Sequence, residues 1–183
     1  MVWIILLVVV VLLALYAIAS YNGLIRGRNQ VENAWSQIDV QLKRRIDLIP
    51  NLVETVKAYA AHEKTTLEAV INARNAAIAA PATPAGQAAA DGQMTGALRQ
   101  LFALGEAYPD LTANQNFLAL QEELSATEGR VAYSRQFYND SVLSYNNKLQ
   151  AFPTVFFARM LKFDKREYFE TDEAAREVPK VQF

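Results

Sequence analysis

The first twenty residues constrain this chain more than any other part of it. Residues Val2 to Ala19 include no charged residue, no proline and no glycine. A helix rises 1.5 Å per residue, so this run spans about 27 Å, close to the thickness of the hydrocarbon core of a bilayer. The sequence therefore predicts an N-terminal transmembrane anchor over residues 1–20.

A cleaved signal peptide is the competing interpretation of this run. Ala17-Ile18-Ala19 fits the small-x-small pattern of a cleavage site. However, no basic region precedes the apolar run, and the run is longer than the apolar part of a usual signal peptide. We therefore favour an uncleaved, single-pass anchor in the cell (inner) membrane.

The orientation of the anchor follows from its flanking charges. Arg26 and Arg28 come just after the apolar run and Lys43-Arg44-Arg45 follows later, whereas only the α-amino group precedes it. Because basic flanks stay on the cytoplasmic side, we expect the N-terminus outside and residues 21–183 in the cytoplasm.

Composition excludes several functional classes. The chain has 183 residues, a net charge of −1, no cysteine and one histidine, His62. It therefore lacks disulfides and thiolate chemistry, and it has no strong field for nucleic acid. His62 beside Glu63 is the one hint of a metal or acid–base site, but no second histidine follows at helical spacing, so we expect a polar residue on the rim of a bundle. No nucleophile or phosphate-loop motif is present. We predict no catalytic, cofactor or metal site.

The apolar spacing after the anchor is helical and not alternating. It continues the anchor's helix as far as Pro50, where the missing backbone donor leads us to expect a kink or short break. The stripe then resumes and ends at residues 80–86, a loop rich in proline and alanine. A shorter helix is predicted from Gln87 to Ala107.

The longest uninterrupted helix is predicted from Ala113 to Ala151, with Thr112 and Gln115 as its capping box. The sequence thus predicts an all-α fold, in which the transmembrane helix continues into an elongated antiparallel three- to four-helix bundle over residues 21–165. Residues 166–183 form a tail, and Thr171 to Phe183 lacks a stable fold of its own.

Polar pairs interrupt the seam of this long helix. Tyr138-Asn139 recurs seven residues later as Tyr145-Asn146, so both pairs share a face, and Glu128 and Arg135 flank it. These side chains either bond to neighbouring helices and fix their register or form a strip that binds a partner. We favour the structural role.

Two further patterns bear on the membrane. Lys43-Arg44-Arg45 lies nearly 40 Å of helix beyond the anchor, so we expect a solvated face or salt bridges there and not lipid contact. Ala19, Gly23 and Gly27 are spaced by four, which suits close packing of transmembrane helices, although a flexible joint at Gly23 is an equally good interpretation.

Long blocks of the sequence resemble the LemA family. They include Val31-Glu32-Asn33-Ala34-Trp35, Asp47-Leu48-Ile49-Pro50-Asn51-Leu52, Tyr108-Pro109-Asp110-Leu111 and Phe152-Pro153. The resemblance covers nearly the whole chain. The candidate structural or interaction residues are Asn33, Trp35, Asp39, Arg44, Arg45, Pro50, Asn51, Glu128, Arg135, Tyr138, Asn139, Tyr145, Asn146 and Pro153.

The resemblance implies a bacterial or archaeal single-pass membrane protein with a long helical bundle, no established enzymatic activity and relatives associated with membrane organisation. We therefore expect a membrane-tethered scaffold that contacts lipid through its anchor, binds copies of itself and has no nucleic acid partner. The alternative is an accessory or adaptor subunit of an envelope protease or transport system, with one specific membrane protein partner.

Overall fold

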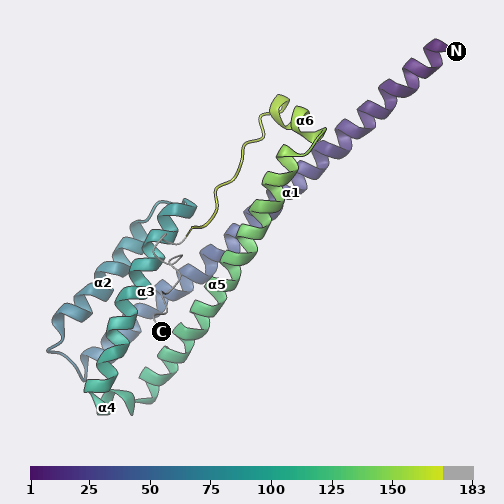
Figure 1. Cartoon of the computed structure of the whole chain (residues 1–183). Coiled ribbons are helices and arrows are strands. Elements are labelled where there is room, and N and C mark those ends of the chain that lie inside the picture. The colour runs from purple at the N-terminus through teal and green to yellow at the C-terminus, as the bar shows by residue number, and fades with distance from the viewer. Residues whose placement is uncertain (171–183) are drawn as a thin grey trace, which may run out of the picture. The chain divides into compact units, whose positions relative to one another are not determined.

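The computed structural model describes residues 1–170, and every regular element in that range is an α-helix (Figure 1). The predicted all-α fold is confirmed. The chain divides into two compact units. Unit 1 comprises residues 1–37 and 136–168, and unit 2 comprises residues 38–135 with Phe169 and Glu170. The predicted unstructured end, Thr171 to Phe183, lies outside the described residues.

Helix α1, Val2–Lys57, is the longest helix in the described part of the chain. Its first eighteen residues are apolar and none of them is buried, and it is the one described helix long and apolar enough to cross a membrane. The prediction that the helix starting near Ala113 would be the longest is therefore wrong. That prediction underestimated the length of α1 because it treated Pro50 as an interruption of this helix.

Of the kink or short break predicted at Pro50, the break is wrong, because α1 continues through Pro50 and ends at Lys57. The turn comes later, over residues 58–63, before α2, Lys64–Ala79. The apolar stripe did not reveal this turn because Ala60 is buried within it. A buried small residue in a turn keeps the helical spacing without continuing the helix.

Helix α3, Pro84–Ala107, begins three residues before its predicted start. Thr83 accepts a hydrogen bond from the Gly86 amide, and Pro84 stands in the first turn, where its missing N–H is not needed. After the single turn of α4, Pro109–Thr112, helix α5 runs over Gln115–Gln150.

The cap of α5 differs from the predicted capping box. Asn114 Oδ1 accepts the amide N–H of Phe117 at 3.0 Å, so Asn114 occupies the capping position that we expected for Thr112. Thr112 instead donates to the Pro109 carbonyl within α4.

The core of unit 2 comes from the C-terminal part of α1, from α2 and α3, and from the first half of α5, which pack as a helical bundle. Figure 1 shows α2 and α3 side by side. Fully buried members of this core are Ile49, Leu52, Val56, Val70, Leu101 and Leu111. Those on α1, α2 and α3 lie on the apolar stripe of their helix, as expected for an amphipathic helix, and Leu111 comes from the short turn α4.

Unit 1 contains the rest of α1, the C-terminal part of α5, and helix α6, Thr154–Met160, followed by an irregular segment. Its buried apolar residues are Leu24, Val31, Ala34, Tyr138, Val142, Tyr145, Leu149 and Ala158. Gly27 allows close packing here, because a Cβ at this position would lie 3.1 Å from Cδ2 of Tyr145. Gly27 therefore serves contact within the chain.

Candidate functional site

The most unusual feature of unit 2 is an ion cluster around a buried pair, Arg45 and Asp91, which Glu128 and Arg135 join from more exposed positions; it is here called the Arg45 cluster. Arg45 Nη1 donates to Asp91 Oδ1 at 2.7 Å, and the two side chains are 3% and 4% exposed. Arg135 Nη1 reaches the other oxygen, Asp91 Oδ2, at 3.3 Å. One carboxylate from α3 thus binds guanidinium groups from α1 and α5.

The electrostatics of the Arg45 cluster follow from burial. An isolated charge in a bundle core is strongly disfavoured, so a buried arginine requires a hydrogen-bonded counter-charge. Asp91 supplies that charge, and Glu128 Oε2 lies 3.8 Å from Arg45 Nη2 at a more exposed position. The Nε of Arg45 is buried and has no hydrogen-bond partner.

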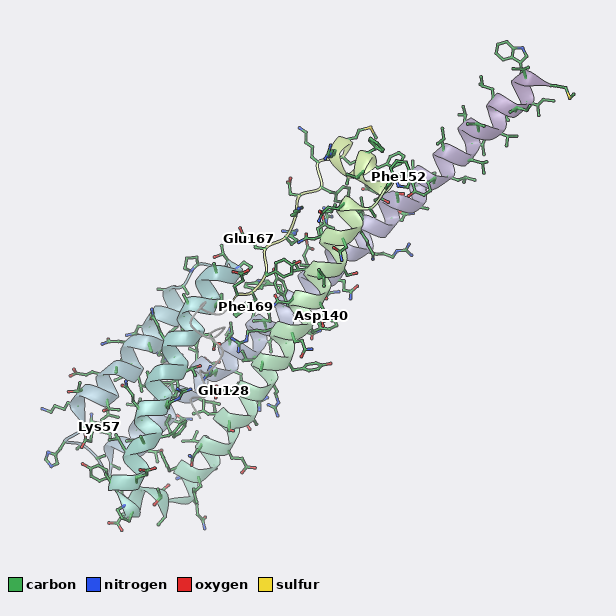
Figure 2. The ribbon with its side chains drawn as sticks, in the orientation of Figure 1. Lys57, Glu128, Asp140, Phe152, Glu167 and Phe169 are labelled. Carbon is green, nitrogen blue, oxygen red and sulfur yellow. The ribbon has the colours of Figure 1, made fainter. Side chains whose placement is uncertain are left out.

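Arg45 and Glu128 also line an open cleft of about 510 Å³ between α3 and α5, here called the α3–α5 cleft. Glu128 is labelled in Figure 2 on α5. The apolar lining comprises Leu98, Phe102, Leu118 and Leu124, and charged groups at the cleft include Arg99 and Glu122. An apolar floor with charges of both signs suits an amphipathic helix of a protein partner.

The charged groups around the cleft are largely paired with one another. Arg45 and Asp91 neutralise each other, and within residues 1–170 no group of His, Asp and Glu side chains is placed to hold a metal ion. His62 lies exposed in the turn between α1 and α2. Near it, Glu63 accepts a hydrogen bond from Tyr108 Oη at 2.9 Å, which raises the pKa of that phenol.

The structure explains how α1 tolerates Pro50. Proline has no N–H for the carbonyl four residues earlier, which here belongs to Ile46. Arg74 Nε on α2 donates to that carbonyl at 3.4 Å. The neighbouring Asn51 is exposed, and its carbonyl accepts the Thr55 hydroxyl at 2.8 Å. Pro50 itself is exposed on the bundle surface.

The predicted polar seam of unit 1 does form hydrogen bonds, but its partners differ from those expected. Tyr138 Oη donates to the Glu167 carbonyl at 2.9 Å. Asn146 accepts the Arg166 N–H at 3.0 Å and donates to the Arg166 carbonyl at 2.9 Å. The prediction that these side chains bond to neighbouring helices is therefore wrong for Tyr138 and Asn146. Both bind backbone groups of the irregular segment after α6.

Aromatic packing completes this seam. The rings of Trp35 and Tyr138 lie 5.5 Å apart between centroids, and Tyr145 packs against Gly27. Burial raises the pKa of the Tyr138 phenol above its ordinary value, and nearby Arg166 partly opposes that rise. Burial likewise raises the pKa of Tyr145.

The remaining predicted residues lie apart from these clusters. Arg44 binds Glu123 at 2.5 Å on a more exposed surface, so both Arg44 and Arg45 form salt bridges. Asn33 and Asp39 are exposed on α1, and Asn139 is half-buried on α5. Pro153 follows a cis peptide bond and precedes the first residue of α6.

Sequence reasoning missed Asp91 and Glu123, the partners of Arg45 and Arg44, and Arg74, which binds the Ile46 carbonyl. Asp91 carries the clearest signal, because it is the one charged residue in the alanine-rich first half of α3. An acid on an otherwise apolar helix face indicates a buried basic partner, but periodicity does not identify which one.

Comparisons with known proteins give one family model and several similar proteins. Residues 34–183 match the model of the LemA family. Protein LemA of Metamycoplasma hominis is 27% identical over 158 residues, covering 85% of this chain and 71% of that protein. Magnetosome protein MamQ 2 of Paramagnetospirillum magneticum and magnetosome protein MamQ of Magnetospirillum gryphiswaldense are each 25% identical over 179 residues, covering 84% of this chain and 66% of the relative. The chain thus spans about two thirds of the length of the MamQ proteins.

Proposed function

The chain belongs to the LemA family, and on that premise we propose that it is a membrane-anchored scaffold without catalytic activity. In this proposal α1 anchors the protein in the cell membrane, with the helical bundle on the cytoplasmic side. Copies then associate through the bundle and organise a patch of membrane.

The observation that carries the anchor is the exposure of the apolar end of α1. Met1 to Leu15 includes side chains such as Trp3 and Leu6 that no other described residue covers. An apolar surface of this extent is strongly disfavoured in water but favoured in hydrocarbon. Further along, α1 carries residues of the buried bundle core, so one continuous helix supplies both parts.

The α3–α5 cleft supports the proposed self-association. Leu118 on its wall is exposed, and α2 exposes Ile71 and Ile78 seven residues apart, on one helix face. In the proposed contact this face of α2 enters the α3–α5 cleft of the next copy. Such a head-to-tail interface generates a ring or an open array, which suits a scaffold.

Co-purification of two tagged forms tests this proposal. Cells express the full chain with two different tags, and membranes are extracted gently and captured through one tag. We expect the second tag in the captured fraction, and we expect Leu118→Glu or Ile78→Glu to remove it, because each places a carboxylate in an apolar contact. Asn72→Glu is the matched control, since Asn72 lies on another exposed part of α2.

The outcomes separate the two functional hypotheses. Membranes that are mixed only after cell lysis give the background level of exchange. Capture of one tag without the other contradicts self-association. A foreign membrane protein in stoichiometric amount, without the second tag, instead supports the adaptor role.

A further inference from the structure

Helix α6 and the turn before it expose an apolar face. Phe152, Phe156 and Met160 are 80%, 63% and 69% exposed. Phe152 and Phe156 contact each other with ring centroids 5.9 Å apart, and Met160 follows one helical turn after Phe156. Three large apolar side chains thus form one surface, which water alone does not favour.

This surface lies beside the membrane-spanning part of α1. Tyr16 and Thr154 share a hydrogen bond of 3.2 Å, and the rings of Tyr16 and Phe157 are 5.9 Å apart. Further along α1, the ring centroids of Tyr21 and Phe163 lie 6.1 Å apart. All of these residues belong to unit 1, and Figure 2 labels Phe152 at the end of α5 next to α6. One face of α6, with Thr154 and Phe157, therefore packs against α1, and the face with Phe156 and Met160 is exposed.

The contact with Tyr16 sets the depth of α6. Tyr16 lies three residues before Ala19, where the apolar run ends, which corresponds to about 4.5 Å along the helix. Amphipathic helices at membrane surfaces bury their apolar face about 5–10 Å into the boundary between headgroups and acyl chains. Once α1 spans the bilayer, α6 lies at this boundary.

Basic residues accompany the apolar face. Arg159 and Lys162 are exposed within and just after α6, and Arg28 lies over the Phe163 ring at 6.0 Å. Cations beside an apolar surface bind the phosphates of anionic lipids while the apolar side chains enter the acyl region. Apolar and basic groups therefore favour the same occupant, a lipid surface.

We propose that α6 and Phe152 form a second membrane contact, which inserts into the bilayer interface beside the anchor and binds anionic lipid. The proposal rests on the anchor role of α1 in the proposed function. Its consequence is that unit 1 is held to the membrane at two points, through α1 and through α6.

The test uses the full chain, which has no cysteine of its own. Phe156→Cys or Met160→Cys is labelled with an environment-sensitive fluorophore and reconstituted into vesicles of phosphatidylcholine and phosphatidylglycerol. The lipids carry a nitroxide quencher on the acyl chain. It lies near the headgroup in the vesicles used for positions 156, 160 and 36, and near the chain end in those used for Val10, which lies in the middle of the apolar run. Val10→Cys is the control for the anchor. Ser36→Cys is the aqueous control in unit 1, about 30 Å along α1 from Tyr16.

We expect labels at positions 156 and 160 to lose most of their fluorescence to the lipid nitroxide, whereas a label at Ser36 keeps it. Vesicles without phosphatidylglycerol should reduce the loss at 156 and 160 but not at Val10. Unquenched labels at 156 and 160 with a quenched label at Val10 overturn this inference alone. If these labels are shielded from a soluble quencher and from lipid as well, protein covers the face and the inference is wrong. A label at Val10 that lipid does not quench refutes the anchor itself.

Discussion

Removal of Asp91 should destabilise the bundle more than removal of its partner Arg45. Asp91→Ala leaves the buried guanidinium of Arg45 without its 2.7 Å counter-charge, while Glu128 lies 3.8 Å away. Breaking a buried pair by removing one partner costs about 3–5 kcal/mol. Arg135, which is 24% exposed, can turn toward solvent and adds little.

The reverse substitution has a smaller expected effect. Arg45→Met keeps the apolar stem and leaves Asp91 with Arg135 as its partner, so we expect a loss of about 1–3 kcal/mol. The double variant Arg45→Met/Asp91→Leu removes both charges and should be more stable than Asp91→Ala, because no buried charge is left unpaired. Arg44→Ala is the surface control, with an expected change of about 0–1 kcal/mol.

Urea unfolding of the detergent-solubilised full chain, followed by circular dichroism, measures these differences. The midpoint and slope give the free energy of unfolding for each variant. A loss below about 1 kcal/mol for Asp91→Ala would refute the reasoning, because such a surface-like value means that the charges of the Arg45 cluster are solvated.

Three further predictions concern unit 1. Gly27→Val should lower the free energy of unfolding by about 1–3 kcal/mol, since its side chain meets Tyr145, whereas Gly23→Val, with open space around it, should change it little in the same urea assay. Asn146→Ala should speed amide hydrogen exchange around Arg166, because both hydrogen bonds to that backbone are lost. Thermal unfolding should show stability that persists below pH 10 and falls as the pH rises further, and Tyr138→Phe should make that fall shallower.

The sign of the pH effect follows from the raised pKa of Tyr138. The unfolded phenol ionises near its ordinary value of 10.0, and the folded phenol ionises at higher pH because it is buried. The folded state therefore holds its proton longer, and stability is lost as the pH passes from the unfolded pKa through the folded one. Equal alkaline profiles for the wild type and Tyr138→Phe would contradict this assignment. Equal destabilisation by Gly27→Val and Gly23→Val would contradict the prediction for Gly27. Unchanged amide exchange around Arg166 in Asn146→Ala would contradict the prediction for Asn146.

Periodicity predicted much of the helical architecture from the sequence. Val31, Ile38, Leu42 and Ile49 follow helical spacing, and all four are buried on α1. A different local rule predicted the end of α3, because Tyr108-Pro109 follows its last residue directly. These features depend only on residues that are close together in the sequence, so the pattern of a single helix is enough to predict them.

The remaining features depend on contacts between distant residues. Pro50 marks a helix end by local rules, yet α1 continues, and Arg74 on α2 donates to the carbonyl that this proline leaves free. Arg45 was identified as a candidate for salt bridges, but its partner Asp91 lies 46 residues away. Tyr138 and Asn146 were recognised as a polar seam, but they bind backbone groups of an irregular segment, which no periodic pattern marks.

The mass of single particles extracted from native membranes into polymer nanodiscs tests the central claim most directly. A membrane-anchored scaffold predicts that the full chain occurs mainly as particles with several copies, and that Leu118→Glu shifts them to single copies. Particles with one copy in the wild type, or recovery of the chain without membrane, would contradict the account.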